Sequence, residues 1–355
     1  MIEYFLHTGM HKTGTKFFQH KAFPNLNSLE ILYNPPRLCQ LICDLLKCNA
    51  CDLDLVMNDI ATEKRKLEAG SAKKILISRE IMSGNLFGFY NDYVEIYSRL
   101  NLAFPEAKII IALRYQVDWI VSCYRESIHE HHYQTIGQFL GFEEGDPRFL
   151  KVDYKDLNYL KIINFLESLF TPENINVFFY EDFYDNKEKI LSRIASILGV
   201  KNIPIIKDND TIPNRGYSAL AIDISIKRYK FLKICKLDRF FVHRPITFFG
   251  PDSIPAGFEQ ISVLPKDRYW HDRFLRDNEE VRLKGYPNNL DLTDRVKLAL
   301  SWRNIIKNIF DKIIYKDWDL LEPYRLELDN YFKNQNIELQ KKASKVVGVL
   351  PVIYL

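Results

Sequence analysis

Short apolar segments alternate with stretches of helical spacing along most of the chain. The apolar segments are flanked by charged residues and lie at 4–7, 75–78, 109–113 and 177–180. Continuous apolar runs of this length are typical of parallel strands that are buried on both faces. Because helical patterns separate them, we expect an α/β fold with a central parallel sheet.

Apolar residues that recur at intervals of three and four predict the helices. They fall at 15–22, 118–129, 157–170, 187–198, 294–314 and 320–344. Gly199 follows the fourth of these helices and is expected to end it in a left-handed conformation. The composition changes after Pro204. We therefore divide the chain into an α/β core at 1–218, an irregular and helical lid or acceptor subdomain at 219–320, and a C-terminal helix and tail at 321–355 that pack on the core.

The charge balance and hydropathy limit the classes of partner. The chain has 49 Lys and Arg against 46 Asp and Glu, a net charge of +3, so no bulk charge attracts nucleic acid. No apolar stretch approaches the roughly 18 residues of a membrane-spanning helix, and the apolar segment 345–355 is too short. No signal-peptide pattern precedes the first strand. We expect a cytoplasmic protein without a membrane span.

Six cysteines are present, and Cys39, Cys43, Cys48 and Cys51 lie close together in the sequence. Zinc sites usually have two close pairs separated by a longer spacer, which this spacing does not match. Cys39 and Cys43 fit one face of an amphipathic helix. Buried, reduced cysteines are therefore favoured over a metal site or disulfides.

A glycine-containing loop after the first predicted strand is the most informative feature of the chain. Residues 8–15 read Thr-Gly-Met-His-Lys-Thr-Gly-Thr and lead into the first predicted helix. Glycines let backbone N–H groups approach an anion, and the helix N-terminus adds a positive field. A Walker A loop has its lysine directly after the second glycine, whereas here Lys12 precedes Gly14. The loop predicts binding of a shorter anionic chain than a nucleoside triphosphate.

Polar side chains also follow the next two predicted strands. Glu80 comes after the second strand and Arg114 after the third. Ligands of open parallel sheets bind at the carboxyl ends of the strands, so we expect Lys12, Glu80 and Arg114 to converge. Ser122, just over a turn inside the next helix, can reach toward a group held by Arg114. A guanidinium and a hydroxyl together suit a phosphate monoester.

Three segments resemble the sulfotransferases that use 3′-phosphoadenosine 5′-phosphosulfate (PAPS). They are the loop at 8–15, the Leu-Arg at 113–114 followed by Ser-Cys-Tyr-Arg-Glu at 122–126, and Phe-Phe-Tyr-Glu-Asp-Phe at 178–183 with the helix ending in Ile-Leu-Gly at 197–199. The resemblance covers residues 1–230 and, more faintly, 320–340. It implies a P-loop-NTPase-like, three-layer α/β/α fold.

The resemblance also implies which residues bind the donor. The loop at 9–15 would hold the 5′-phosphosulfate, with Lys12 at the leaving phosphate, through Gly9, His11, Lys12, Thr13, Gly14 and Thr15. Lys16 stands where the family has Thr or Ser, and it either adds to phosphate binding or points outward. Arg114 and Ser122 would hold the 3′-phosphate. Arg215 either closes over that phosphate or belongs to a plain turn.

The same resemblance implies the product 3′-phosphoadenosine 5′-phosphate (PAP) and transfer without a metal ion. The missing Walker A lysine position, and a second strand that ends without a metal-binding Asp, agree with a metal-free donor. The chain departs from the family after Arg114, with Tyr115 and Gln116 in place of Asn/Asp-Pro and Trp119 in place of an arginine. This departure concerns the entry into the helix and the adenine side.

Glu80 is our first choice for the general base that activates the acceptor, and His11 is the second. Glu80 follows the second strand and faces the loop, and carboxylates serve as bases in the carbohydrate and protein-tyrosine sulfotransferases that the chain resembles. Two alternatives stay open. Glu80 could instead form an ion pair with Arg79 or Lys12, and His11 could pack outside the site.

Two further segments invite a functional interpretation. Residues 129–132, His-Glu-His-His, do not match the H-E-x-x-H zinc motif, and a solvated helix end is favoured over a metal site. Residues 219–250 are basic and aromatic. They could bind an anionic acceptor such as an acidic glycan, associate with a membrane surface, or form a solvated helix face.

The leading hypothesis is a PAPS-dependent sulfotransferase acting on a hydroxyl, or an amine, of an acceptor that we expect to be a carbohydrate or glycolipid; a small-molecule acceptor stays open. The alternative on the same loop is a small-molecule or nucleotide kinase, which should have Gly-Lys-Ser/Thr and an acidic metal-binding strand end. A third hypothesis is a non-catalytic nucleotide-binding protein. The sequence leaves the acceptor and the oligomeric state open.

Overall fold

The computed structural model describes residues 2–29, 31–70, 72–147, 149–205, 216–236, 305–306, 313–342, 351 and 354. Clustering of contacts gives two compact units: Met1–Cys123, Val152–Pro213 and Leu321–Leu355 form the first, and Tyr124–Lys151 and Asn214–Leu320 form the second. The predicted helix at 294–314 lies mostly outside the described residues. The predicted division of the chain at residues 218 and 320 stays a prediction.

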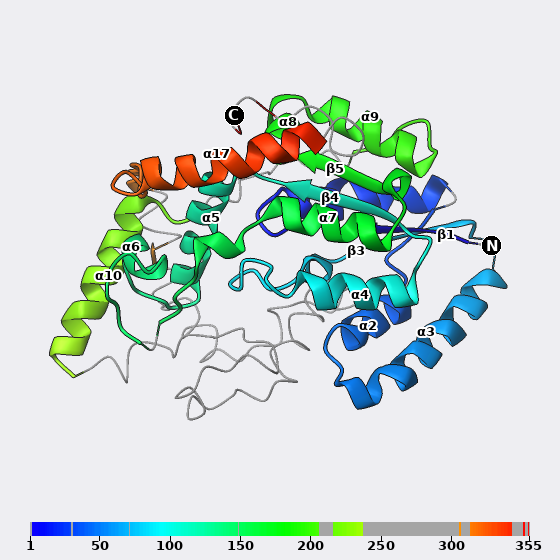
Figure 1. The fold of residues 1–355 in the computed structure, drawn as a ribbon, viewed down its shortest axis with the longest axis horizontal. Helices are drawn as coiled ribbons and strands as arrows, with labels where there is room; N and C mark the ends of the chain where they lie inside the picture. The colour runs from blue at the N-terminus through cyan, green and yellow to red at the C-terminus, as the bar shows by residue number, and fades with distance from the viewer. Residues whose placement is uncertain are drawn as a thin grey trace. The chain divides into compact units, whose positions relative to one another are not determined.

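The first unit contains a five-stranded, all-parallel sheet in the order β2-β3-β1-β4-β5 (Figure 1). The strands are β1 Glu3–His7, β2 Ile31–Tyr33, β3 Lys74–Ser78, β4 Lys108–Leu113 and β5 Ile175–Phe179. Four of them confirm the predicted strands to within two residues at each end. The edge strand β2 was not predicted, because it is three residues long and only Ile31 is buried.

The register of β1 places its carboxyl end between two neighbouring strand ends. His7, the last residue of β1, pairs with Ser78 of β3 on one side and with Ile110 of β4 on the other. The loop after β1 therefore leaves the sheet between the segments that follow β3 and β4. This is the convergence expected for ligand sites of open parallel sheets.

One face of the sheet is covered by the segments that follow β1 and β5. They are α1 Thr15–Phe17, the π-helical turn Phe18–Ala22, the 3₁₀ segment Phe23–Leu29, α8 Tyr180–Asp185 and α9 Lys187–Leu198. A single buried cluster joins Phe18, Phe23, Leu26, Ile190, Ile194 and Leu198 to the strand residues Phe5, Leu76, Ile110 and Phe178. The helix predicted at 15–22 is present, with its second part π-helical.

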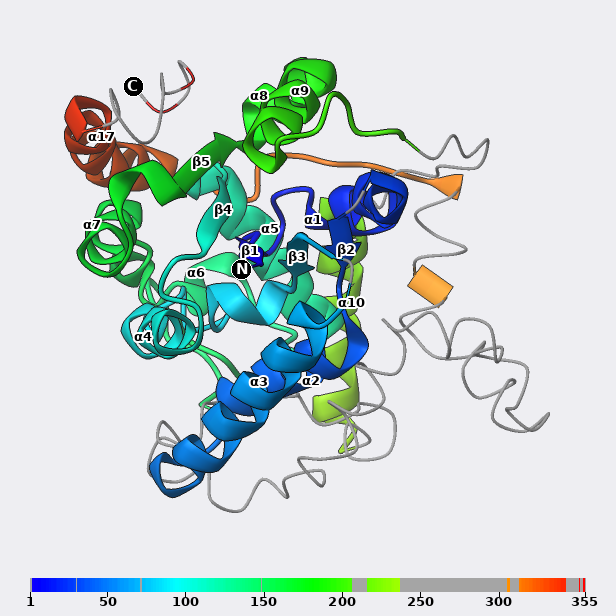
Figure 2. The same ribbon diagram turned by 90° about the vertical axis from the view of Figure 1, so that its right-hand side faces the viewer.

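The opposite face carries α4 Tyr93–Ala103 and α7 Tyr159–Leu169, which contact each other (Figure 2). Tyr4 of β1 packs on Phe104 with ring centroids 5.2 Å apart, and Asn101 donates to the carbonyl of Leu169 at 2.9 Å. α17 Arg325–Lys342 packs on α7, and α2 Pro36–Leu45 packs on α3 Leu53–Glu68. Helices on both faces of the sheet confirm the three-layer α/β/α prediction.

The remaining helices connect these layers or belong to the second unit. α5 Gln116–His129 begins two residues before the predicted start, and α6 Ile136–Phe139 and α10 Ala219–Ile234 follow in the second unit. The single-turn 3₁₀ helices are Ala50–Asp52, Glu80–Ser83, Tyr154–Asp156 and Pro172–Asn174. No helix among the described residues has the length and apolar content needed to cross a bilayer.

The basic and aromatic stretch predicted at 219–250 is described only as far as residue 236. Within α10, Lys227 pairs with Asp223 at 2.7 Å and Lys233 pairs with Asp146 at 2.8 Å. Tyr229 is buried, whereas Phe231 is exposed. The described part of this stretch is therefore a helix with one packed side rather than a continuous cationic face.

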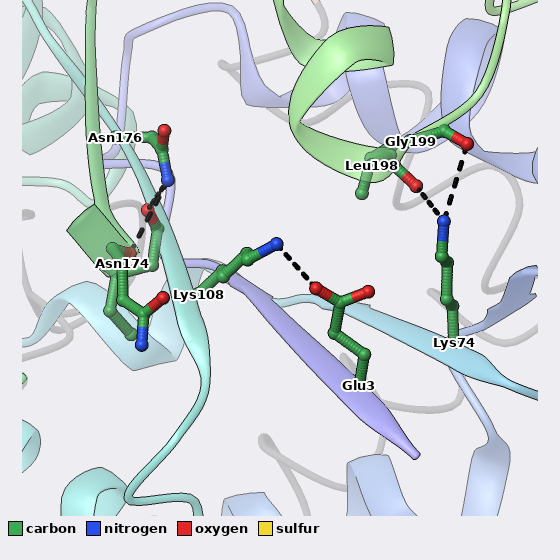
Figure 3. Close-up of polar contacts among 8 residues, drawn as sticks. Glu3, Lys74, Lys108, Asn174, Asn176, Leu198 and Gly199 are labelled. Atoms are coloured by element: carbon green, nitrogen blue, oxygen red, sulfur yellow. Dashed lines mark hydrogen bonds and ion pairs between the residues drawn. The ribbon is translucent and has the colours of Figure 1, made fainter. Parts of the chain in front are cut away.

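The amino-terminal edge of the sheet is closed by paired charges (Figure 3). Lys108 at the start of β4 forms an ion pair with Glu3 at the start of β1. Lys74 donates to the carbonyls of Leu198 at 2.7 Å and Gly199 at 3.4 Å, at the end of α9. Gly199 has φ 63°, which confirms its predicted left-handed role. A lysine at a helix C-terminus satisfies carbonyls that have no partner inside the helix.

The six cysteines, all among the described residues, are not joined in disulfides. Cys39 and Cys123 are buried, and Cys43 and Cys48 are half-buried. Cys51 and Cys235 are exposed, so the expectation that the cysteines are core residues is wrong for these two. Cys39 and Cys43 lie on α2, the amphipathic helix that their spacing predicted.

Candidate functional site

The loop after β1 requires glycine at one position and favours it at another. A Cβ atom on Gly9 would lie 2.6 Å from Oγ1 of Thr15 and 2.8 Å from Cε1 of His7. Gly14 has φ 80° and is the N-cap residue of α1, a conformation that favours glycine. Lys12 adopts φ 67°. Left-handed residues other than glycine are strained and are concentrated at functional sites.

The threonine hydroxyl groups of the loop bond to the loop itself. Oγ1 of Thr13 donates to the carbonyl of Met10 at 2.6 Å, and Oγ1 of Thr15 donates to the same oxygen at 3.2 Å. The side chains of Thr13 and Thr15 are buried. Their hydroxyl protons therefore hold the loop together, and their backbone N–H groups are left to interact with a ligand.

A run of loop amides is open. Within the described part of the chain, the N–H groups of Thr13, Gly14, Thr15 and Lys16 donate to no acceptor. Successive amides around left-handed residues form a concave anion-binding nest, and the first amides of a helix have no partner within it. The half-buried Lys12 and the exposed Lys16 add positive charge. This arrangement suits a phosphate or sulfate group.

Arg114 lies directly beside the loop. Its guanidinium Nη1 donates to the carbonyl of Lys12 at 3.2 Å, and the group lies over the ring of Tyr180 with Cζ 4.8 Å from the ring centroid. The hydroxyl of Tyr159 donates to the Arg114 carbonyl at 2.7 Å. A guanidinium has five N–H donors, so the bond to Lys12 leaves others for an anion. The structure thus brings Lys12 and Arg114 together.

A half-buried carboxylate supports the backbone next to Arg114. Glu181 accepts the N–H of Tyr115 at 2.9 Å and the hydroxyl of Tyr354 at 3.0 Å. Burial raises the pKa of Glu181 above its usual value, and these hydrogen bonds and the Arg114 charge oppose the rise. Tyr180 and Glu181 both lie in the segment 178–183 that carried part of the family resemblance. Their contacts show that this segment positions the Arg114 region.

Glu80 begins the single-turn helix Glu80–Ser83 and is separated from the end of β3 by Arg79. Within the described residues its carboxylate forms an ion pair with neither Arg79 nor Lys12, so that alternative is not what the structure has. Burial raises the pKa of Tyr90 well above its usual value, and the negative charge of Glu80 adds to the rise.

Two aromatic side chains hold the backbone of His11. Its N–H donates to the hydroxyl of Tyr90 at 2.9 Å, and its carbonyl accepts the indole N–H of Trp119 at 2.8 Å. The imidazole stacks on the Tyr90 ring at a centroid distance of 6.1 Å. The half-buried His11 ring thus packs against an aromatic side chain, and its role as a second-choice base stays a prediction.

The other predicted ligands of the 3′-phosphate are Ser122 and Arg215. Ser122 is a half-buried residue of α5, and within the described residues it forms no hydrogen bond with Arg114. Arg215 lies outside the described residues. The assignments of Ser122 and Arg215 stay predictions.

A buried polar network beneath the loop was not predicted. Nδ1 of His7 lies 2.7 Å from Oγ of Ser78, Gln19 donates to the carbonyl of Ser78 at 3.1 Å, and the Ser78 N–H donates to Asn34 Oδ1 at 2.7 Å. Burial lowers the pKa of His7 to about 3, so the ring is neutral. Polar residues that end two adjacent apolar strands are the sequence signal that could have indicated this network.

The histidines at 129–132 have separate environments. The His129 ring lies 3.9 Å from that of Tyr217, Nδ1 of His131 lies 2.9 Å from the Tyr133 hydroxyl, and Nδ1 of His132 accepts the Leu150 N–H at 3.1 Å. His129 and His132 are buried, so the favoured solvated helix end is wrong for them. No group of three His, Cys, Asp or Glu side chains among the described residues could hold a metal ion.

No protein-family model matches the chain, and no curated protein matches its sequence. Among solved structures, the chain is similar to a sulfotransferase from Alicyclobacillus acidocaldarius, at 17% identity and TM-score 0.41, over 67% of this chain and 95% of that one. It is also similar to mouse sulfotransferase SULT7A1 complexed with PAP, at 14% identity and TM-score 0.30, over 84% of this chain and 88% of that one. At these identities and TM-scores, neither likeness identifies an activity for this chain.

Proposed function

We propose that the chain is a sulfotransferase that moves the sulfuryl group of PAPS to a hydroxyl or amine of an acceptor. The observation that carries this proposal is the 3.2 Å contact between the Arg114 guanidinium and the Lys12 carbonyl. It puts a guanidinium and the open amides of the loop on one edge of one sheet. A single nucleotide with phosphates at both ends can engage a guanidinium and a loop that lie this close together.

The residues of the loop fit the 5′ end of such a donor. The open N–H groups of Thr13, Gly14, Thr15 and Lys16 supply hydrogen-bond donors without needing a metal ion. Gly9 allows the close approach of Thr15 and His7, which a Cβ would obstruct, and Gly14 supplies the left-handed turn before α1. The ammonium groups of Lys12 and Lys16 supply the positive charge.

For the 3′-phosphate we propose Arg114, with Ser122 and Arg215 as further ligands. Arg114 is supported by its position beside the loop, and its fork of donors matches phosphate geometry. Ser122 is supported by its place on α5, which follows Arg114 in the chain. The proposed role of Arg215 depends on the motif resemblance alone.

The donor supplies an activated sulfuryl group, whose bond to the 5′-phosphate breaks as the acceptor oxygen or nitrogen bonds to sulfur. The protein's part in such an in-line transfer is mainly positioning and charge stabilisation. We assign to Lys12 the stabilisation of negative charge on the leaving phosphate oxygen. Glu80 takes the acceptor proton onto a carboxylate oxygen, and the absence of an ion-pair partner in the described residues leaves that carboxylate available. His11 is the second choice.

For the acceptor we propose a carbohydrate or glycolipid hydroxyl, and for the reaction a metal-independent transfer in the cytoplasm. The carboxylate base at the end of β3 supports the acceptor class through the resemblance to carbohydrate sulfotransferases. Metal independence is supported by the loop sequence, in which no lysine follows Gly14 directly.

A thermal-shift series tests the proposal. We expect 3′,5′-ADP (PAP) and PAPS to stabilise the protein equally with and without Mg²⁺, by about 2.7 kcal/mol at a hundred times the dissociation constant. ATP and GTP are the matched controls and should have little effect. Stabilisation only by Mg-ATP would contradict the proposal and favour the kinase. Binding of PAPS without PAP formation in the presence of any tested sugar acceptor would favour a non-catalytic protein.

A further inference from the structure

The backbone N–H and the backbone carbonyl of His11 are each hydrogen-bonded to a side chain far away in the sequence. Tyr90, from the segment between β3 and α4, accepts its N–H at 2.9 Å, and Trp119, from α5, donates to its carbonyl at 2.8 Å. His11 immediately precedes Lys12, the left-handed residue of the loop. The two aromatic side chains therefore fix the chain direction at the point where the anion-binding segment begins.

The two clamping side chains form one rigid aromatic group. The Tyr90 and Trp119 ring centroids are 5.3 Å apart, and Phe89 packs on Trp119 at 5.1 Å. All three side chains are completely buried. Such packing holds side chains in single conformations. The phenol oxygen is therefore a fixed acceptor, and the indole N–H is a fixed donor.

The backbone that carries Tyr90 is itself strained. Phe89 has φ 50° and Tyr90 has φ 63°, and consecutive bulky residues in the left-handed region are rare. Strain of this kind persists only where surrounding contacts impose it, and it is concentrated at functional sites. Here it turns the Tyr90 hydroxyl toward the loop.

The Tyr90 hydroxyl also lies in the field of Glu80. After burial and the neighbouring Tyr159 and Cys123, the Glu80 charge is among the causes that raise the Tyr90 pKa. Tyr90 therefore stays protonated, and one side chain contacts the loop backbone while lying near the proposed base.

We propose that Tyr90 and Trp119 are positioning residues of the anion loop. These two hydrogen bonds to the backbone N–H and carbonyl of His11, which we call the clamp, keep Lys12 left-handed. They also keep the amides from Thr13 to Lys16 open to an anion before any ligand arrives. The identity of that anion as PAPS rests on the proposed function, but the clamp itself does not. Neither side chain is assigned a contact with the donor.

The variant Tyr90→Phe tests this inference, because it removes only the hydroxyl and keeps the buried ring. The matched control is Tyr124→Phe, which removes another buried hydroxyl whose hydrogen bond goes to the Gln134 carbonyl at 2.7 Å. Trp119→Phe removes the donor on the other side of the peptide. Hydrogen exchange of the 8–18 segment is measured in the ligand-free proteins, and the dissociation constant for 3′,5′-ADP is measured by calorimetry.

We expect Tyr90→Phe and Trp119→Phe to speed exchange of the hydrogen-bonded amides of this segment, such as those of Thr8 and Phe17, which donate to the carbonyls of Ile110 and Gly14. We also expect both variants to weaken 3′,5′-ADP binding by about tenfold, a difference of about 1.4 kcal/mol. Tyr124→Phe should change neither the exchange of this segment nor the affinity for 3′,5′-ADP, even if its melting temperature falls as far as those of the other two variants. Loop exchange equal to that of the control would overturn the clamp. If wild type fails to bind 3′,5′-ADP, the proposed function fails, and the exchange measurement still decides the clamp. Tight wild-type binding that both variants retain overturns the clamp and leaves the function standing.

Discussion

The two edges of the sheet differ in how their polar groups are satisfied. At the amino-terminal edge, Lys108 pairs with Glu3, and Lys74 donates to the last carbonyls of α9 (Figure 3). At the carboxyl-terminal edge, the amides from Thr13 to Lys16 have no acceptor within the described residues. The charges at the first edge stabilise the fold, whereas the second edge has hydrogen-bond donors that remain available for a ligand.

This difference has an energetic cost that indicates function. An amide without an acceptor in the protein gains no intramolecular hydrogen bond, a contribution of about 0.5–1.5 kcal/mol. The left-handed Lys12 adds strain. We interpret the open amides and the strained Lys12 at the carboxyl-terminal edge as features of a ligand-binding site, because the opposite edge has paired its polar groups. Matched substitutions at the two edges can test this interpretation.

The largest effect should come from Glu80→Gln. As the proposed base, Glu80 should contribute about 10²–10⁴-fold to kcat, with little change in 3′,5′-ADP binding. Glu3→Gln is the matched control at the opposite edge, because it removes the same charge from the ion pair with Lys108. PAP release from PAPS measures the rate. Full activity of Glu80→Gln would transfer the role of base to another group, with His11→Ala as the next variant to examine.

Lys12→Met should lower kcat by about 10²–10³-fold, the range found when one stabilising donor is removed from a reacting centre. Lys108→Met removes a lysine at the amino-terminal edge and should leave kcat nearly unchanged. The comparison uses PAP release and a melting curve for each variant. Equal losses of activity in the two variants would mean that the edges do not differ in function.

Arg114→Met should weaken 3′,5′-ADP binding by about 10–100-fold, corresponding to about 1.4–2.8 kcal/mol. Binding of 5′-AMP, which has no 3′-phosphate, should change much less. Calorimetry with the two nucleotides separates the two ends of the site. A uniform loss for both would show that Arg114 supports the loop through the Lys12 carbonyl and does not read the 3′-phosphate.

His7 should make stability depend on pH at the carboxyl-terminal edge. Burial holds its folded pKa at about 3, below the usual value of about 6.5. The unfolded chain therefore binds the proton first, so this contribution is complete above about pH 6.5 and falls by up to about 1.4 kcal/mol per pH unit below it. Urea unfolding at about pH 7, 6 and 5 should show a shallower dependence in His7→Gln. An identical dependence in both proteins would contradict the assignment.

The smallest effect is expected at the amino-terminal edge. Lys74→Met removes the hydrogen bond to Leu198 at the end of α9 and should lower the free energy of unfolding by about 1 kcal/mol. Binding of 3′,5′-ADP should stay as in wild type. Chemical denaturation and calorimetry provide the two measurements. Weakened nucleotide binding without a stability change would reverse the roles assigned to the two edges.

The sequence alone determined the strands, the main helices and the loop, because each depends on local spacing. Apolar runs marked β1, β3, β4 and β5, and the positions of Gly9 and Gly14 marked an anion loop. Local spacing did not predict one strand and gave the wrong environment for two histidines. The three-residue strand β2 has no periodic signal, and the buried environments of His129 and His132 depend on partners such as Tyr217 and Leu150.

Only the tertiary structure decided which side chains surround the loop. The sheet order puts β1 between β3 and β4, and this brings Arg114 to Lys12 and both Tyr90 and Trp119 to the His11 peptide. No periodic pattern records these contacts, because they join residues about a hundred positions apart and depend on backbone conformations such as the left-handed Tyr90. Local chemistry therefore indicates the proposed anion loop, and long-range packing gives it its shape.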